Sequence, residues 1–273
     1  MGAQETHWPR LLTAALLLAV LFLVVGCSTG DPQNTFSPEG DVAERQRDLF
    51  NLVLWPAVAV LVIVEGLLIY AVVRFRRKSA DELPEQVHGN TRMELAWTIA
   101  PALLLLAIAV PTVSAIIDLG RAPAADALQV NVTAFRWDWQ FEYPDLKNAE
   151  GKAIVIAGTC GAGRCAELHI PVGREIGAHL EALDVVHSFW VPKLAGKLDV
   201  IPGRANRMWF NATKPGTYSG QCAEFCGLGH AGMRLTVVAE SEEDFQAWVD
   251  EQLNGGGSTS APQGAPELVS RGE

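Results

Sequence analysis

Two long apolar runs constrain the fold of this chain more than any other feature. The first extends from Phe50 to Val73 and is interrupted only by Asn51 and Glu65, and the second extends from Leu95 to Ile117. About 20 apolar residues in a helix cross a hydrocarbon core of about 30 Å. They also account for a positive mean hydropathy, which is unusual for a soluble protein. We therefore expect a two-helix transmembrane hairpin over residues 49–119.

Basic residues between the two runs predict which side of the membrane the hairpin faces. The connecting segment contains Arg74-Phe-Arg76-Arg77-Lys78, and Arg92 lies further on. Short loops rich in Arg and Lys remain on the cytoplasmic side. Both ends of the chain are then expected on the outer side.

The N-terminal segment resembles a bacterial lipoprotein signal. A charged start ends at Arg10, an apolar run covers Leu11 to Val25, and Gly26 and Cys27 follow. Cleavage would remove residues 1–26 and leave a lipidated Cys27, whereas an ordinary signal peptide or a retained helix is the alternative. Residues 27–48 would form an outer segment. These features predict a bacterial cell-membrane protein that crosses the membrane more than once.

The remaining chain has the pattern of an all-β domain. Short alternating apolar runs are broken by Gly and Pro, as is typical of strands. They cover Gln129–Phe135, Ala153–Ala157, Glu167–Pro171, Glu175–Leu183, Arg207–Asn211, Gly216–Gly220 and Gly232–Ala239. The pattern favours an antiparallel β-sandwich or barrel with Greek-key connections over residues 120–253. Residues 254–273 are rich in Gly, Ser, Ala and Pro and are predicted to be disordered.

Soft metal donors gather near the end of this domain. Cys226, His230 and Met233 have the Cys-x3-His-x2-Met spacing of a single-loop copper site, which an earlier His187 would complete. Cys222 adds a second thiolate, so one loop can present two sulfurs that bridge a pair of copper ions. A dicopper centre would relay single electrons. A zinc site or a disulfide remains the alternative, because zinc also accepts two Cys and two His.

Three motifs resemble subunit II of the haem-copper cytochrome c oxidases. They are Asp-Val-Val-His-Ser-Phe-Trp at Asp184–Trp190, Ile-Pro-Gly-Arg-Ala-Asn at Ile201–Asn206, and Gln-Cys-Ala-Glu-Phe-Cys-Gly-Leu-Gly-His at Gln221–His230. The resemblance covers most of residues 50 to 240. It implies a cupredoxin-like Greek-key barrel, and a dicopper (CuA) centre that takes electrons from cytochrome c and passes them to haem in subunit I. Oxygen reduction coupled to proton translocation would take place in the whole complex.

The resemblance also implies specific site residues. The copper ligands carried over are His187, Cys222, Glu224 through its backbone carbonyl, Cys226, His230 and Met233. The Glu224 side chain would bind a magnesium ion shared with subunit I. The implied partners are subunits I and III, a cytochrome c donor and the membrane, with no nucleic acid.

Trp137 is the expected point of electron entry by the same resemblance. It belongs to an aromatic segment in which Trp139 and Phe141 are interpreted as core residues. Asp138 departs from the family, because many relatives have an aromatic residue there. The segment from Gly120 to Glu273 contains 19 acidic and 13 basic residues, a net charge of −6. A basic donor could therefore dock electrostatically, with Asp138 and Asp184 as candidate contacts.

Two carboxylates belong to the predicted hairpin. Glu94 opens Glu-Leu-Ala-Trp-Thr-Ile-Ala-Pro, which resembles the family's motif at the cytoplasmic mouth of a proton pathway. From its position alone, Glu94 is a favourable partner for the helix dipole. Glu65 lies within the first apolar run, where we favour a neutral, hydrogen-bonded acid over a proton-handling role.

The remaining cysteines and histidines have simpler interpretations. Cys160 and Cys165 enclose a short loop, and on an oxidising outer face a disulfide is expected, with a second metal site as the alternative. His169 and His179 are interpreted as packing or surface residues. The chain has no Cys-x-x-Cys-His motif, so it carries no c-type haem of its own.

Two other functions remain open from the sequence. A quinol oxidase subunit II would have the same fold without the copper ligands. A copper-storage or copper-delivery protein would bind the metal without relaying electrons, but it would need neither a membrane hairpin nor Glu94.

Overall fold

The computed structural model describes most of the hairpin and the whole of the β domain apart from three loop residues. The described residues are 14, 17–18, 31–77, 89–158, 160 and 163–255. Most of the predicted signal segment together with Cys27, part of the basic loop including Lys78, and the predicted tail beyond residue 255 lie outside them.

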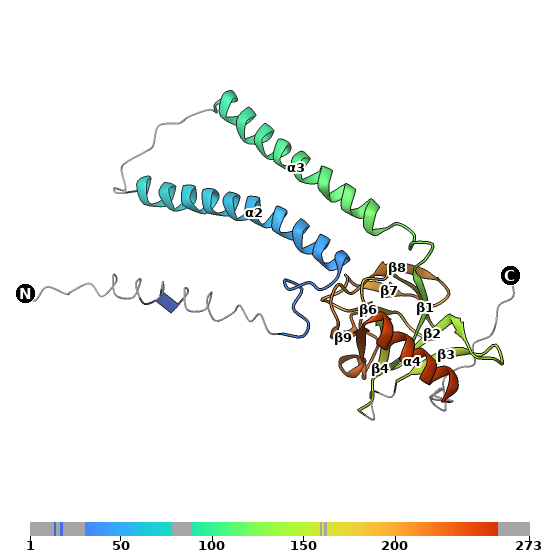
Figure 1. The fold of residues 1–273 in the computed structure, drawn as a ribbon. Coiled ribbons are helices and arrows are strands. Elements are labelled where there is room, and N and C mark those ends of the chain that lie inside the picture. Colours follow the sequence, from blue (N-terminus) through green and yellow to red (C-terminus); the bar gives the residue numbers. More distant parts are fainter. Residues whose placement is uncertain are drawn as a thin grey trace, which may run out of the picture.

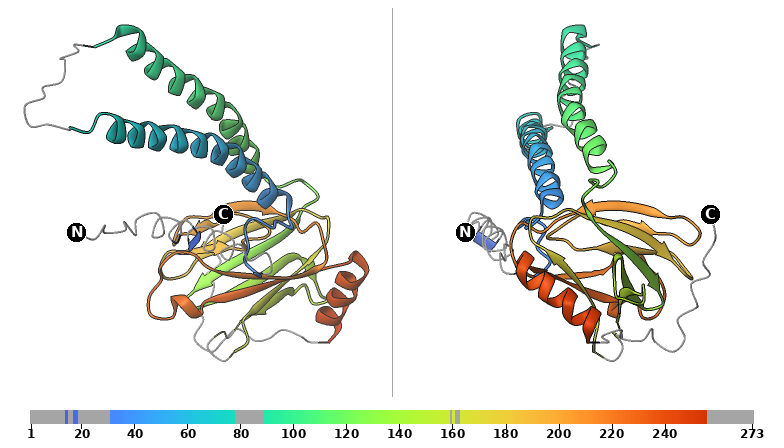
Figure 2. Two further views of the ribbon diagram at one scale, coloured as in Figure 1. Left: turned by 90° about the vertical axis from the view of Figure 1, so that its left-hand side faces the viewer. Right: turned by 45° about the vertical axis from the view of Figure 1, so that its right-hand side comes forward.

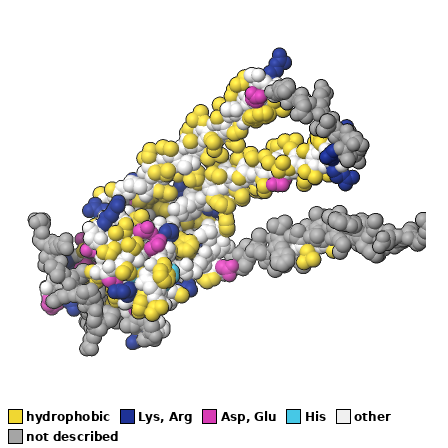
Figure 3. All heavy atoms as spheres, turned by 180° about the vertical axis from the view of Figure 1, so that it is seen from behind, with side chains coloured by type: hydrophobic (Ala, Val, Ile, Leu, Met, Phe, Trp, Pro, Cys, Tyr) yellow, Lys and Arg dark blue, Asp and Glu magenta, His cyan; other side chains and the backbone are white. Residues whose placement is uncertain are grey.

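Two long helices extend from one side of a β domain (Figures 1 and 2). Helix α2 covers Asp41–Arg74 and helix α3 covers Thr91–Leu119. Both are long and apolar enough to cross a membrane, and almost none of their apolar residues is buried. Hydrophobic side chains cover them, with basic side chains at the ends away from the β domain (Figure 3). The predicted pair of spanning helices is thus present, with Pro56, Pro101 and Pro111 inside the helices.

Helix α2 begins nine residues before the apolar run that predicted it. The backbone N–H of Asp41 donates to Asn211 Oδ1 at 2.9 Å, and Asn211 Nδ2 donates to Asp41 Oδ2 at 2.8 Å. A side chain from the β domain therefore caps the helix and supplies an acceptor for one of its unpaired N–H groups. Helix α3 has a local cap, because Asn90 Oδ1 accepts from the N–H groups of Arg92 and Met93.

The β domain consists of two five-stranded sheets. The first has the order β3-β2-β1-β5-β8, and the second has the order β4-β10-β9-β6-β7. The strands of the first sheet are β1 Leu128–Phe135, β2 Asp138–Lys147, β3 Ala153–Ala157, β5 Ile176–Ala182 and β8 Asn206–Phe210. Those of the second are β4 Ala166–Pro171, β6 His187–Trp190, β7 Leu198–Val200, β9 Gly216–Cys222 and β10 Arg234–Glu240.

The core lies between the two sheets. Trp139, Phe141 and Tyr143 on β2 are fully buried, as are Phe189 on β6 and Phe210 on β8. Fully burying a large apolar side chain stabilises a fold by about 1.5–3 kcal/mol. The interpretation of Trp139 and Phe141 as core residues is confirmed. Trp137, which an extended strand would place on the same face, instead lies in the turn between β1 and β2.

The strand pairing departs in part from the antiparallel arrangement expected from the sequence. Strand β1 pairs with β5 in parallel, and β4 pairs with β10 in parallel, whereas the other pairs are antiparallel. Parallel partners need a long crossover connection, and here each pair is separated by intervening strands of both sheets. The fold class is as expected: two apolar helices followed by an all-β, cupredoxin-like domain.

Four short elements were not predicted. Strands β6 and β7 lie where no strand was expected, so His187 opens a strand, and a 3₁₀-helix covers His230–Gly232. Helix α4, Glu242–Asn254, follows β10 and buries Phe245 and Val249 against the core. Ser241 caps it by accepting from the N–H of Asp244 at 3.1 Å. The helix packs against β4 and β10, where Trp248 stacks on His169 with ring centroids 4.4 Å apart.

The interpretations of the remaining cysteines and histidines hold in the structure. Cys160 and Cys165 form a disulfide, as expected. His169 packs against Trp248 and lies 3.1 Å from Glu240. His179 Nε2 lies 3.0 Å from Gln129 Oε1.

Candidate metal centre

Two neighbouring strands and one loop bring the predicted metal ligands to the same end of the β domain. His187 opens β6, and Cys222 ends β9, which pairs antiparallel with β6 through Phe189 and Cys222. The loop from β9 to β10 carries the other predicted ligands. It is closed at its base, because the Cys222 N–H donates to the Met233 carbonyl at 2.9 Å.

The sulfur and imidazole atoms converge around Cys222 and Cys226. The two Sγ atoms are 3.8 Å apart and are not joined in a disulfide. His187 Nδ1 lies 3.8 Å from Cys222 Sγ, and His230 Nδ1 lies 3.7 Å from Cys226 Sγ. Met233 Sδ is 3.8 Å from Cys226 Sγ. Among the described residues, His187, Cys222 and Cys226 form a cluster that could hold a metal ion.

Glu224 supplies a sixth donor through its backbone. Its carbonyl oxygen lies 3.2 Å from Cys222 Sγ. Its side chain points elsewhere and is about half exposed, with Oε2 3.9 Å from Lys197 Nζ. The backbone and the carboxylate of Glu224 are therefore available to different partners.

The electrostatics of the two thiols favour a cation between them. Burial raises the pKa of Cys222, but hydrogen bonds, chiefly with His187, outweigh this effect and lower its pKa overall. Burial and the negative charge of Cys222 both raise the pKa of Cys226. Two thiolates this close repel each other unless a cation compensates them.

The donor set fits copper. Two thiol sulfurs, two imidazole nitrogens, a thioether and a carbonyl lie close together, and His187, Cys222, Cys226 and Met233 are buried. Thiolate and thioether ligands select soft metals such as copper. Structural zinc is almost always bound by four ligands, so it would leave donors of this set unused. The unpaired cysteines also argue against the disulfide alternative.

A carboxylate orients His187. Asp184 Oδ1 accepts a hydrogen bond from His187 Nε2 at 2.9 Å, which leaves Nδ1 facing Cys222. Asp184 Oδ2 also accepts from the backbone N–H of Arg136 at 2.9 Å and from Arg136 Nε at 3.0 Å. Carboxylates that hold metal-binding histidines in this way fix the tautomer and the ring orientation. The sequence analysis missed this role of Asp184, although its place three residues before His187 was a signal.

Trp137 lies against the ligand loop. Its Nε1 donates to the Cys226 carbonyl at 3.1 Å, and 38% of the residue is exposed. The ring covers Gly229 so closely that a Cβ there would lie 2.4 Å from Trp137 Cδ2. The predicted entry residue therefore combines an exposed edge with a direct contact to the backbone of a predicted ligand.

Neither candidate docking carboxylate is a free surface charge. Asp138 is only 7% exposed, so its proposed role as a docking contact is wrong. Asp184 is paired with Arg136 and His187. The ligand loop instead exposes two large apolar side chains, Phe225 and Leu228.

Glu94 and Glu65 lie away from this centre on the helices. Glu94 occupies the first turn of α3, at the end remote from the β domain, and Glu65 lies in the second half of α2. The structure does not bring either carboxylate to the metal ligands.

Comparison with known proteins identifies the two parts of the chain. The family model described as cytochrome c oxidase subunit II, periplasmic domain, matches residues 128–240, and its transmembrane-domain counterpart matches residues 33–115. Cytochrome c oxidase subunit 2 of Alkalihalophilus pseudofirmus is 34% identical over 247 residues, which cover 87% of this chain and 68% of that protein.

Two further matches are of interest. Quinol oxidase subunit 2 of Bacillus subtilis is 33% identical over 252 residues, which cover 89% of this chain and 73% of that protein. The solved periplasmic domain of subunit II of cytochrome oxidase (CoxB) of Bradyrhizobium japonicum is 31% identical with a TM-score of 0.45, and covers 50% of this chain and 99% of that one.

Both family models and the relative at 34% identity agree with the two apolar helices and the β domain. The candidate metal cluster lies within the part that matches the periplasmic domain. This chain therefore belongs to the cytochrome c oxidase subunit II family and is a membrane protein with an extracytoplasmic domain.

Proposed function

We propose that this chain is the electron-entry subunit of a respiratory cytochrome c oxidase in a bacterial cell membrane. It accepts electrons from a cytochrome c at a dicopper (CuA) centre and delivers them to haem in subunit I, where oxygen reduction is coupled to proton translocation. The observation that carries this proposal is the pair of free, buried cysteine sulfurs 3.8 Å apart, surrounded by two imidazoles, a thioether and a carbonyl.

The residues at this centre have different proposed roles. Cys222 and Cys226 would hold the copper ions through their thiolates, and His187, His230, Met233 and the Glu224 carbonyl would complete the ligand set. The bound copper pair supplies one-electron redox chemistry. The Asp184 carboxylate holds the His187 ring in place. Burial of the ligands excludes water and keeps their geometry fixed when the charge changes.

Trp137 is the proposed electron entry point. Its exposed edge can meet a donor, and its Nε1 contacts the Cys226 carbonyl at 3.1 Å. Glu224 is proposed to extend its side chain to a magnesium ion shared with subunit I, because that carboxylate is exposed and points away from the sulfurs. Subunit III is a further proposed partner in the complex.

The ligand set separates this function from that of a quinol oxidase. A quinol oxidase subunit 2 is nearly as similar to this chain as a cytochrome c oxidase subunit 2 is, so overall identity does not distinguish them. The candidate copper ligands distinguish the two functions, because a subunit II that takes electrons from quinol needs no copper centre. A copper-storage protein is disfavoured by the long spanning helices and by Glu94.

The test compares electron donors in the purified complex. The wild type should oxidise reduced cytochrome c and retain copper, whereas Cys222→Ser should lose the copper pair and at least about 100-fold of this activity, since removing a positioned group can cost ~10²-fold in rate. The exposed Thr217→Ser on the same strand is the control. Oxidation of quinol but not of cytochrome c by the wild type would contradict the proposal.

A further inference from the structure

We propose that the buried Asp138 carboxylate and the Cys160–Cys165 disulfide form a brace that positions Trp137 on the metal loop. Asp138 is then a positioning residue for electron entry, with no contact to the metal ligands themselves. This inference rests on the proposed function, because it assumes that electrons enter through Trp137.

Asp138 is held from two sides, although it follows an exposed residue. Its Oδ2 accepts from the N–H of Cys160 at 2.8 Å, and its Oδ1 accepts from the N–H of Trp139 at 3.1 Å. Burial raises the pKa of this carboxyl above its ordinary value, and the two N–H groups offset only part of that rise. A buried carboxylate is costly unless it is hydrogen-bonded, so Asp138 ties the start of β2 firmly to the disulfide loop.

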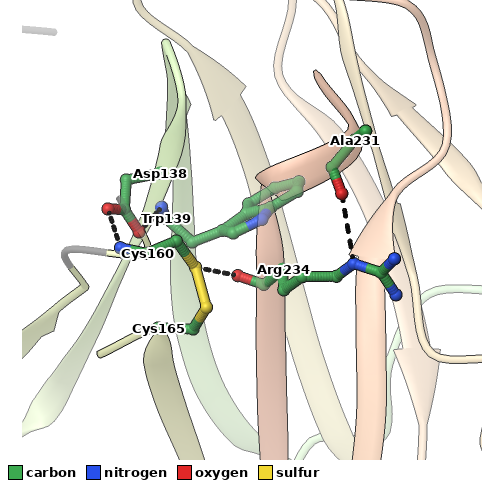
Figure 4. The surroundings of a disulfide bond; sticks show 6 residues. All are labelled: Asp138, Trp139, Cys160, Cys165, Ala231 and Arg234. Atoms are coloured by element: carbon green, nitrogen blue, oxygen red, sulfur yellow. Dashed lines mark hydrogen bonds between the residues drawn. A yellow bond between two sulfur atoms is a disulfide. The ribbon is translucent and has the colours of Figure 1, made fainter. Parts of the chain in front are cut away.

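The disulfide extends this connection to the other side of the metal loop. Cys160 Sγ lies 3.0 Å from the carbonyl oxygen of Arg234, the residue that follows Met233 (Figure 4). Arg234 Nε in turn donates to the Ala231 carbonyl at 3.3 Å. Cys160 therefore contacts β2 at Asp138, directly after Trp137, and β10 at Arg234, directly after the predicted copper ligand Met233.

The entry to the disulfide loop is too tightly packed to shift easily. A Cβ on Gly158 would lie 2.4 Å from Asp138 Oδ1 and 2.3 Å from the backbone nitrogen of Ala166. The Gly158 N–H also donates to the Trp139 carbonyl at 3.1 Å. Only a glycine fits between the carboxylate and this backbone, so the position of Asp138 is fixed.

Trp137 thus lies between two anchors. On one side, Arg136 is bound to Asp184, and on the other, Asp138 is bound to Cys160. The indole needs this placement, because its contact with the Cys226 carbonyl is a single hydrogen bond on an exposed ring. Replacing Asp138 by Asn would place an N–H group or a weaker acceptor against the Cys160 N–H, and would loosen one of the two anchors.

The experiment measures electron transfer from cytochrome c to copper in the assembled oxidase by rapid mixing. Asp138→Asn should slow transfer within the docked complex roughly tenfold, because misplaced reacting groups can cost up to ~100-fold in rate. Donor affinity, copper content and the copper spectrum should remain those of the wild type. Asp145→Asn, an exposed Asp on the same strand, is the matched control and should leave the rate unchanged.

A second variant removes the disulfide and leaves the carboxylate in place. Cys160→Ser combined with Cys165→Ser should slow transfer in the same direction with copper retained. A wild-type rate of electron transfer to copper in both variants, or copper loss from Asp138→Asn, would overturn the proposal of a brace. A wild-type complex that lacks copper or does not oxidise cytochrome c would instead refute the proposed function.

Discussion

Through a single side chain, Asp184 connects the candidate ligand His187 with the turn between β1 and β2 that carries Trp137. One oxygen accepts from His187 Nε2, and the other accepts two hydrogen bonds from Arg136. Burial raises the pKa of this carboxyl, but the hydrogen bonds from His187 and from the backbone and side chain around it outweigh burial and lower the pKa overall. The carboxylate is therefore charged at neutral pH and fixes the ring of His187.

Asp184→Asn should weaken copper binding. Removing the partner of a metal-binding histidine typically costs about 10–100-fold in metal affinity. Copper retained by the purified complex after dialysis against graded concentrations of a chelator measures the effect. Asp126→Asn, an exposed acid of the same domain, should retain copper like the wild type. Equal retention by Asp184→Asn would mean that the metal loop alone orients His187.

At the scale of elements, the sequence predicted those strands and helices whose formation depends on the local pattern of apolar and polar residues. Strands with clear alternation, such as Ala153–Ala157, were found with nearly the expected bounds. Strand β7 was missed because three residues are too few for a pattern, and the outer start of α2 was missed because its cap, Asn211, lies 170 residues away. The candidate copper ligands were identifiable because each brings a distinctive donor atom, whereas the role of Asp184 depends on tertiary contacts.

The junction between α3 and the β domain depends on Arg121 and Glu175. Arg121 donates to both carboxylate oxygens of Glu175 at 3.0 and 2.6 Å, and its guanidinium lies 3.8 Å from the ring centroid of Trp209. The hydrogen bond from Arg121 is the main cause that lowers the pKa of Glu175. A lowered pKa stabilises the fold above the unfolded-state pKa of about 4.3, and this contribution is lost as the pH falls through the folded-state pKa.

Glu175→Gln should therefore destabilise the protein at neutral pH and much less near pH 3. The expected loss is about 1 kcal/mol, near the low end for charged hydrogen bonds, because the pair is partly exposed. Thermal unfolding in detergent, followed by intrinsic fluorescence, should show a fall of roughly 2–4 °C at pH 7. Glu181→Gln, at an exposed position of strand β5, which follows Glu175, is the control. A loss that is independent of pH would show that the charge of Glu175 contributes nothing.

At the scale of the whole molecule, the two proposed tasks lie at opposite ends. The metal cluster lies in the β domain, whereas Glu94 lies near the far end of α3, which spans roughly 40 Å at ~1.5 Å per residue. The proposed electron entry and the proposed proton entry would therefore lie on opposite sides of a membrane crossed by α2 and α3. Substitutions near Trp137 should leave proton entry unchanged, and substitutions at Glu94 should leave electron entry unchanged.

Glu94→Gln should slow oxygen reduction by the assembled oxidase roughly tenfold while copper reduction by cytochrome c remains fast, since a positioned proton-transfer group contributes ~10²-fold or more to a rate. Steady-state oxygen consumption and rapid-mixing kinetics measure the two steps separately. Glu65→Gln, the other carboxylate of the hairpin, should leave both rates unchanged. Unchanged turnover at saturating donor in Glu94→Gln would leave Glu94 as a helix-end residue only.

The proposed function depends above all on a pair of copper ions held by Cys222 and Cys226. Its most direct test is the copper content of the purified subunit, together with electron paramagnetic resonance of its oxidised form. We expect two copper ions per chain and a mixed-valence spectrum in which one unpaired electron is shared equally by both. One copper ion per chain, or bound zinc without a copper signal, would contradict it.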